Sequence, residues 1–147
     1  MPTLPEVLLD ETKKIQVVED CCALIDAEVK DKGGLSGLAI KAGYGAVKGI
    51  KPGFIKQAVT DMLPDFAKAL DPLFQEGQGQ GKTAGDFFSQ NSTRAADALL
   101  AITDARAAKV KSGVVKGTYD KLRGSAKKNV EAAIPRLGKM IEKFAAG

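Results

Sequence analysis

The chain has 147 residues, enough for one folded domain and too few for two independent cores. Apolar residues make up 44% and charged residues 27%, proportions that are typical of soluble globular proteins and exclude a disordered chain. Histidine is absent, which excludes Ser-His-Asp triads, Cys-His dyads and histidine-ligated zinc sites.

The net charge of +4 is unevenly distributed along the chain. Residues 105–147 hold eleven Lys and Arg against three Asp and Glu, whereas the acidic residues prevail before them. This basic third indicates an acidic partner, which would be nucleic acid, an anionic membrane surface or an acidic protein. The alternative interpretation is a solvated lysine-rich face that only aids solubility.

The start of the chain, its hydropathy and its two cysteines indicate the cellular compartment. No basic segment followed by an apolar run opens the chain, so a secretory signal is not expected, and no run is long enough to span a membrane. Cys21 and Cys22 are neighbours in a helical pattern and point about 100° apart, which favours reduced thiols. We therefore expect a cytoplasmic protein without a transmembrane segment.

The first fifty residues predict a short turn and two helices. Thr3 caps a turn over residues 4–9, and Asp10 caps a long helix over residues 11–31 that ends at Gly33-Gly34. The apolar seam of that helix consists of Ile15, Val18, Cys22, Ile25 and Val29.

A glycine-rich helix over residues 37–50, capped by Ser36, follows. Glycine costs roughly 1 kcal/mol relative to alanine inside a helix, so several glycines there indicate close contact with a neighbouring backbone. The candidates for such close packing are Gly37, Gly45 and Gly49. Gly45 and Gly49 have the four-residue spacing of a membrane dimerisation face, but Lys41 and Lys48 interrupt the apolar character of the segment. We therefore expect a tightly packed soluble helix.

The middle of the chain predicts a broken helix and a loop. Helical spacing continues from Phe54 to Leu70 across Pro64, where we expect a kink or a restart. Residues 77–85, rich in Gly and Gln, are predicted to form a flexible loop. Gly81-Lys82-Thr83 lacks the earlier glycine and the preceding strand that a phosphate-binding loop requires.

Three further helices are predicted over residues 92–111, 113–124 and 125–145, the last capped by Ser125. No segment alternates between polar and apolar residues as a strand would. The sequence therefore predicts an all-α fold, a compact single-domain bundle of six to eight helices that spans residues 1–147.

The last helix separates an apolar arc from a cationic one. Its apolar side belongs to the core, and the opposite side is the candidate surface for an anion or a partner. Four basic residues form this cationic arc: Lys128, Arg136, Lys139 and Lys143.

Catalytic, metal and cofactor sites are not predicted. Asp97 and Asp104 share one face of a helix, but Arg94 and Arg106 supply positive charge nearby, as is common on solvated helices. No other set of reactive side chains stands out. We therefore expect a protein that is not an enzyme and binds no cofactor.

Several stretches resemble a family of small, uncharacterised bacterial proteins of actinobacterial type, a domain of unknown function. These stretches are Asp26–Val29, Gly33–Gly37, Leu63–Phe66, Ala96–Leu100, Asp104–Arg106 and Leu122–Val130. The likeness covers residues 4–144 and implies a single helical domain in the bacterial cytoplasm. It implies no activity, cofactor or functional residue.

Three functions are compatible with these features. The first is a binding or scaffolding module that acts through self-association, as a homo-oligomer, or through an acidic partner. The second is nucleic-acid binding by the basic C-terminal third, although no aromatic residues lie among its lysines to stack on bases. The third is a carrier of an apolar ligand or lipid held between the helices.

Overall fold

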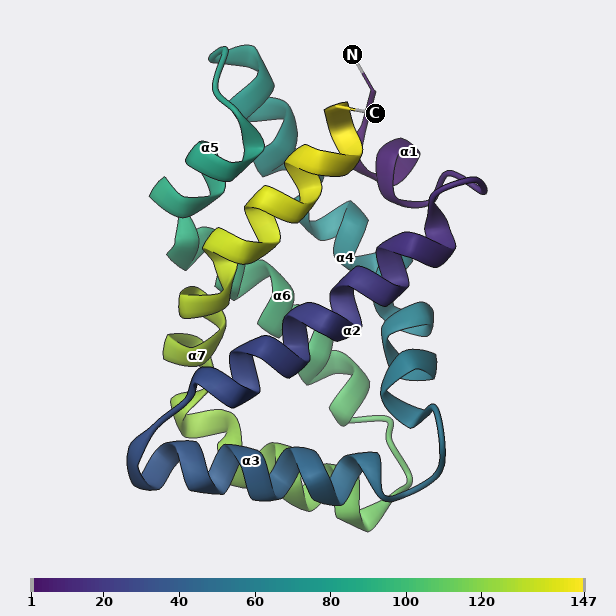
Figure 1. Ribbon diagram of the computed structural model, residues 1–147, viewed down its shortest axis with the longest axis vertical. Coiled ribbons are helices and arrows are strands. Elements are labelled where there is room, and N and C mark those ends of the chain that lie inside the picture. Colours follow the sequence, from purple (N-terminus) through teal and green to yellow (C-terminus); the bar gives the residue numbers. More distant parts are fainter. Residues whose placement is uncertain (1, 147) are drawn as a thin grey trace.

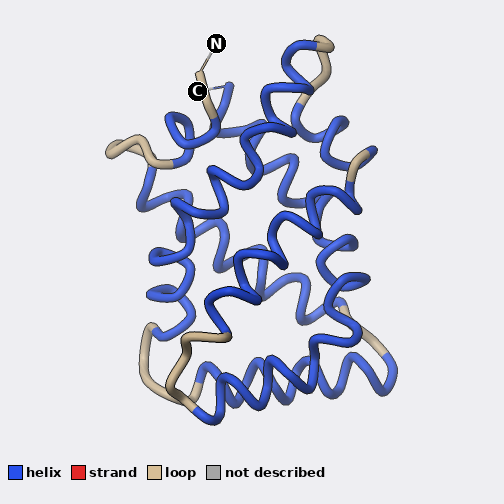
Figure 2. Tube along the Cα trace, turned by 180° about the vertical axis from the view of Figure 1, so that it is seen from behind, coloured by secondary structure: helices blue, strands red, loops and turns tan. Residues whose placement is uncertain are grey.

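The computed structural model describes residues 2–146, apart from the side chains of Leu35 and Ser36. Seven helices and no strand occur in this part of the chain, which confirms the all-α prediction (Figures 1 and 2). The helices are α1 (Leu4–Leu8), α2 (Lys14–Asp31), α3 (Gly34–Lys48), α4 (Phe54–Gly79), α5 (Ala84–Gln90), α6 (Ser92–Ala107) and α7 (Gly113–Ala146).

The helix starts near the N-terminus follow the predicted caps in part. The Thr3 side chain accepts a hydrogen bond from the Glu6 amide at 3.2 Å, as expected for the cap of α1. Asp10 accepts from the Thr12 amide at 2.8 Å, but α2 begins only at Lys14, after a turn. Helix α3 begins at Gly34, earlier than predicted, and the side chain of Ser36 lies outside the described residues.

Helix α4 corrects the prediction of a loop and rules out one of the two alternatives at Pro64. It continues through Pro64 without a restart, contains Pro72 as well, and extends to Gly79, into the segment predicted as a loop. Gly81, at φ 70°, ends it: the Lys82 amide donates to the Gly77 carbonyl at 2.9 Å and the Gly81 amide donates to the Gln78 carbonyl at 3.0 Å. This pair of bonds is a Schellman motif, so the connection to α5 is short.

Two more corrections concern the second half of the chain. Helix α5, capped by Thr83, occupies residues that were not assigned to a helix. Helix α7 is a single helix of 34 residues in place of the two that were expected, with Pro135 inside it. Its first part runs beside α3, and its second part packs against α5 (Figure 1).

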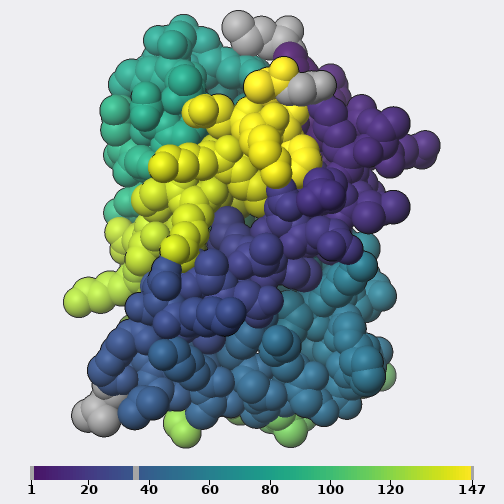
Figure 3. All heavy atoms as spheres, in the orientation of Figure 1, coloured from purple at the N-terminus to yellow at the C-terminus, as the bar shows by residue number. Residues whose placement is uncertain are grey.

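The apolar core occupies one end of the molecule. It is formed by α1, the start of α2, most of α4, α5, the first part of α6 and the second part of α7, and its fully buried side chains include Phe88, Leu70 and Ile141. Among the residues whose burial is described, none of the buried core hydrophobics comes from residues 19–58 or 101–133. Figure 3 shows α3 and the start of α7 at the other end, the α3 end of the molecule.

Candidate apolar ligand cavity

The α3 end contains a cavity of about 480 Å³ that is open to solvent on one side. Four helices line it, together with Val29 of α2 and Val110 of the loop between α6 and α7. The lining is mainly apolar; the side chains that give it this character include Ile40, Val47, Phe54, Ile55, Met62, Val115 and Leu122.

The contact between α3 and α7 closes one side of the cavity. The two helices lie close together at Gly43, where a Cβ would lie 2.8 Å from Thr118 Cγ2 and 3.1 Å from Leu122 Cδ1. The absence of a side chain at Gly43 therefore lets the two helices approach each other. Ile40 and Val47, three before and four after it on α3, reach into the cavity.

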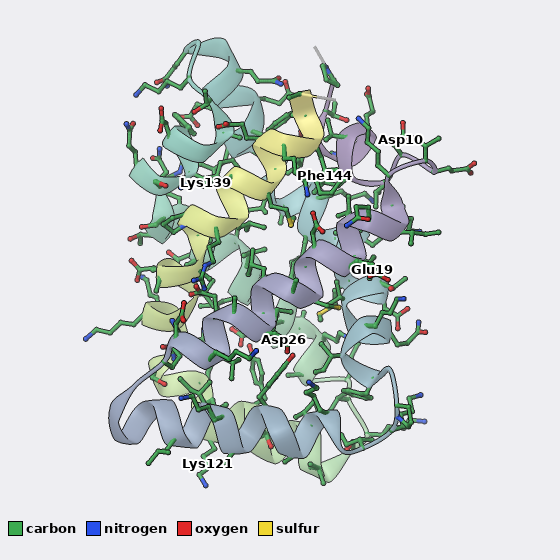
Figure 4. All side chains as sticks on the ribbon, viewed as in Figure 1. Asp10, Glu19, Asp26, Lys121, Lys139 and Phe144 are labelled. Atoms are coloured by element: carbon green, nitrogen blue, oxygen red, sulfur yellow. The ribbon has the colours of Figure 1, made fainter. Side chains whose placement is uncertain are left out.

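Two tyrosines present their rings to the cavity and bind carboxylates through their hydroxyls. The Tyr44 hydroxyl donates to Asp26, which lies on the side of α2 that faces α3 (Figure 4). The Tyr119 hydroxyl donates to Asp104 and lies 2.8 Å from Thr103 Oγ1. Burial and then the neighbouring carboxylate raise the pKa of both phenols, so both stay protonated at neutral pH.

Charged groups lie at the rim of the cavity. Arg106 Nη2 is 3.2 Å from Asp61 Oδ2, and the exposed Lys51 also borders the space. A second cleft of about 470 Å³ shares Met62, Arg106 and Val110 with it. The site is thus an apolar space with a polar, mostly basic rim, the usual composition of a small-molecule pocket.

Comparison with known proteins gives the chain a family. The model of a family described as "Family of unknown function (DUF6918)" matches residues 4–145, which is nearly the whole chain. The chain belongs to this family. No curated protein and no solved structure matches it.

The cationic arc of this DUF6918 chain lies against the acidic helix α2. Arg136 pairs with both Glu28 and Asp31, and Lys143 pairs with Asp20. Lys128 and Lys139, the other two members of the arc, are exposed, and no described carboxylate lies within 4 Å of their amines. Half of the arc thus holds α7 to α2, and its positive charge is neutralised there.

The close helix packing in α3 differs from the prediction. Gly37 is buried, and a Cβ there would lie 2.7 Å from the Lys32 carbonyl carbon. A Cβ at Gly45 would meet nothing within 4 Å, and one at Gly49 would meet only carbonyls of its own helix. The spacing identified a glycine-rich helix correctly, but Gly43, which faces α7, makes the close contact.

The carboxylates of α6 do not converge on a common site. Asp104 binds Arg123 at 2.8 Å, while Asp97 lies 3.3 Å from Lys127. Arg94 pairs with Glu76 of α4. Among the described residues, no group of three potential metal-ligating side chains is present.

The cysteines are free and differ in environment. Burial raises the pKa of the Cys21 thiol to about 12, so it stays protonated at neutral pH. Its sulfur lies 4.0 Å from the Met140 sulfur, at the edge of the core. A protonated, half-buried thiol is a poor nucleophile, and Cys21 is therefore a packing residue.

None of the helices described is both long enough and apolar enough to cross a bilayer.

The sequence signals for the cavity are the apolar residues of α3, α4 and α7 at helical spacing. This spacing predicts which helix faces are apolar, but it does not predict how completely their side chains fill the space between the helices.

Proposed function

We propose that this chain is a non-enzymatic binding protein that holds an apolar ligand in the cavity between α3, α4, α6 and α7. The observation that carries the proposal is the mainly apolar space of about 480 Å³ at the end of the molecule where the described side chains include no buried core hydrophobics. Its volume falls within the range of about 300–1,000 Å³ that is usual for small-molecule sites.

The chemistry of the lining favours a flexible hydrocarbon chain. The tyrosine hydroxyls are engaged with Asp26 and Asp104, so the cavity offers few free polar groups to fix the orientation of a polar ligand. Each methylene group moved from water into such a space contributes about 0.8 kcal/mol. Binding energy would therefore come from chain length.

The alternatives receive less support from the described contacts. An acidic partner or nucleic acid on the cationic arc would have to compete with Glu28, Asp31 and Asp20 for Arg136 and Lys143.

The free thiols of Cys21 and Cys22 support a cytoplasmic location, which we include in the proposal.

A series of straight-chain alcohols from hexanol to dodecanol tests the proposal. We expect the dissociation constant, measured by displacement of a fluorescent apolar probe, to fall about fifteenfold for every two added carbons until the cavity is full. Affinity that does not depend on chain length would contradict it.

A matched pair of variants locates the binding. Ala58 lines the cavity, whereas Ala101 is exposed on α6. Ala58→Leu adds bulk inside the space and should weaken dodecanol binding at least tenfold, while Ala101→Leu should bind as the wild type does. Equal affinities in all three proteins would place the ligand elsewhere.

A further inference from the structure

The α3 end has a strongly basic surface made from two segments. Residues 34–53 and 105–124 contain nine Lys and Arg and a single carboxylate, Asp120. Three of the nine are paired with carboxylates of other segments or helices: Lys48 with Asp26, Arg106 with Asp61, and Arg123 with Asp104. Six exposed lysines remain: Lys41, Lys51, Lys109, Lys111, Lys116 and Lys121.

These lysines belong to adjoining parts of the molecule. Helix α3 and the first part of α7 lie beside each other, and the loops before α4 and α7 meet at the same corner in both views (Figures 1 and 2). Lys121 projects away from the bundle below α3 (Figure 4). Lys51 and Val110 of the two loops line the same cavity, which brings the loops together.

The same end exposes apolar side chains. Leu38 of α3 is 65% exposed, Val114 of α7 is 51% exposed, and Ile50 precedes α4 at 37%. On the outer face of α3, Leu38 is followed by a stripe of exposed small residues, which are Ala42, Gly45 and Gly49. Lys41 and Lys48 lie along one edge of this stripe. Lysines beside an exposed leucine are the combination that interfacial helices present to a membrane.

We propose that the α3 end docks on an anionic phospholipid surface. The six lysines would lie among the headgroups while Leu38, Ile50 and Val114 enter the boundary between headgroups and acyl chains. A nucleic acid offers the same negative charge but no apolar layer, and both tyrosines near this end turn their hydroxyls to carboxylates of the chain. The observed combination of lysines with exposed aliphatic side chains therefore favours lipid.

This surface lies on the same end as the cavity, and the docking stands whether or not the cavity takes a ligand. If it does, the helices that form the outer wall of the cavity, α3 and the start of α7, are those that meet the membrane.

Co-sedimentation with vesicles tests the docking. We expect the full chain to sediment at low salt with vesicles that contain phosphatidylglycerol, to sediment little with pure phosphatidylcholine, and to dissociate as salt is raised. The pair Lys41→Gln and Lys121→Gln should lower the partition coefficient about thirtyfold. Leu38→Ser should lower it several-fold.

Matched controls keep the test specific. Lys68→Gln with Lys82→Gln removes the same charge from α4 and the loop after it, and Ile15→Ser changes the exposed apolar residue at the start of α2. These should sediment as the wild type does, and all variants should keep its melting temperature. Absence of sedimentation with the anionic vesicles, equal losses in the controls, or tighter binding to duplex DNA than to the vesicles would overturn the proposal.

Discussion

At the scale of single residues, surface carboxylates connect neighbouring helices through ion pairs and hydrogen bonds. Asp104 accepts hydrogen bonds from Arg123 and Tyr119, which hold the pKa of its carboxyl below the usual value. Lys143 lowers the pKa of Asp20 in the same way across the contact of α2 and α7. A carboxyl with a lowered pKa in the folded state stabilises the fold while it is ionised.

The pH dependence of stability follows from these groups. Their contribution is complete above the unfolded pKa of about 3.9 and is lost as the pH falls through the lower folded values. Because the chain has no histidine, we expect a nearly constant free energy of unfolding between about pH 5 and 7 and a decline below about pH 4. Urea unfolding across this range measures it.

Asp104→Asn identifies one contributor to that decline. The variant should be less stable than the wild type at neutral pH, and the difference should shrink as the pH falls below about 4. A constant difference at every pH would show that the ionised carboxylate does not stabilise the fold.

At the scale of elements, the crossing of α5 and α7 depends on Gly138. A Cβ at this position would lie 3.0 Å from the Ala84 carbonyl oxygen, 3.0 Å from Phe88 Cβ and 3.2 Å from Gly85 Cα. Two of these three atoms are backbone and cannot move aside without shifting α5. The glycine thus sets how closely the two helices approach.

A pair of alanine substitutions in α7 tests this crossing. Gly138→Ala should destabilise the protein by about 1–3 kcal/mol, because the added methyl overpacks the contact. Gly117→Ala, where a Cβ meets nothing within 4 Å, should instead gain up to about 1 kcal/mol of helix stability. Thermal and urea unfolding give both values, and equal stability of Gly138→Ala and the wild type would contradict the tight contact.

The sequence predicts which segments are helical far better than where each helix begins and ends. Periodic apolar residues identified α2, α4, α6 and the second part of α7, since one face of each is buried. Gly124-Ser125 suggested a boundary in α7, but both parts of that helix pack on neighbours, α3 and α5, and tertiary contacts outweigh the local cost of glycine. Ile15, expected in the seam of α2, is 75% exposed because α2 turns Val17 and Val18 inward.

At the scale of the whole molecule, the two ends differ in how they are filled. One end buries Phe88, Leu70 and Ile141 in a continuous core, and the other leaves a cavity between apolar faces. Sequence patterns could predict which faces are apolar. They could not predict the cavity, because its volume depends on the crossing of α3 over α7 at Gly43 and on the distance of that pair from α4.

Occupancy of this cavity is tested most directly by native mass spectrometry of the chain mixed with dodecanol. We expect a one-to-one adduct with the wild type and with Ala101→Leu, and loss of that adduct with Ala58→Leu. An adduct that persists equally in Ala58→Leu, or no adduct with any of the three proteins, would contradict it.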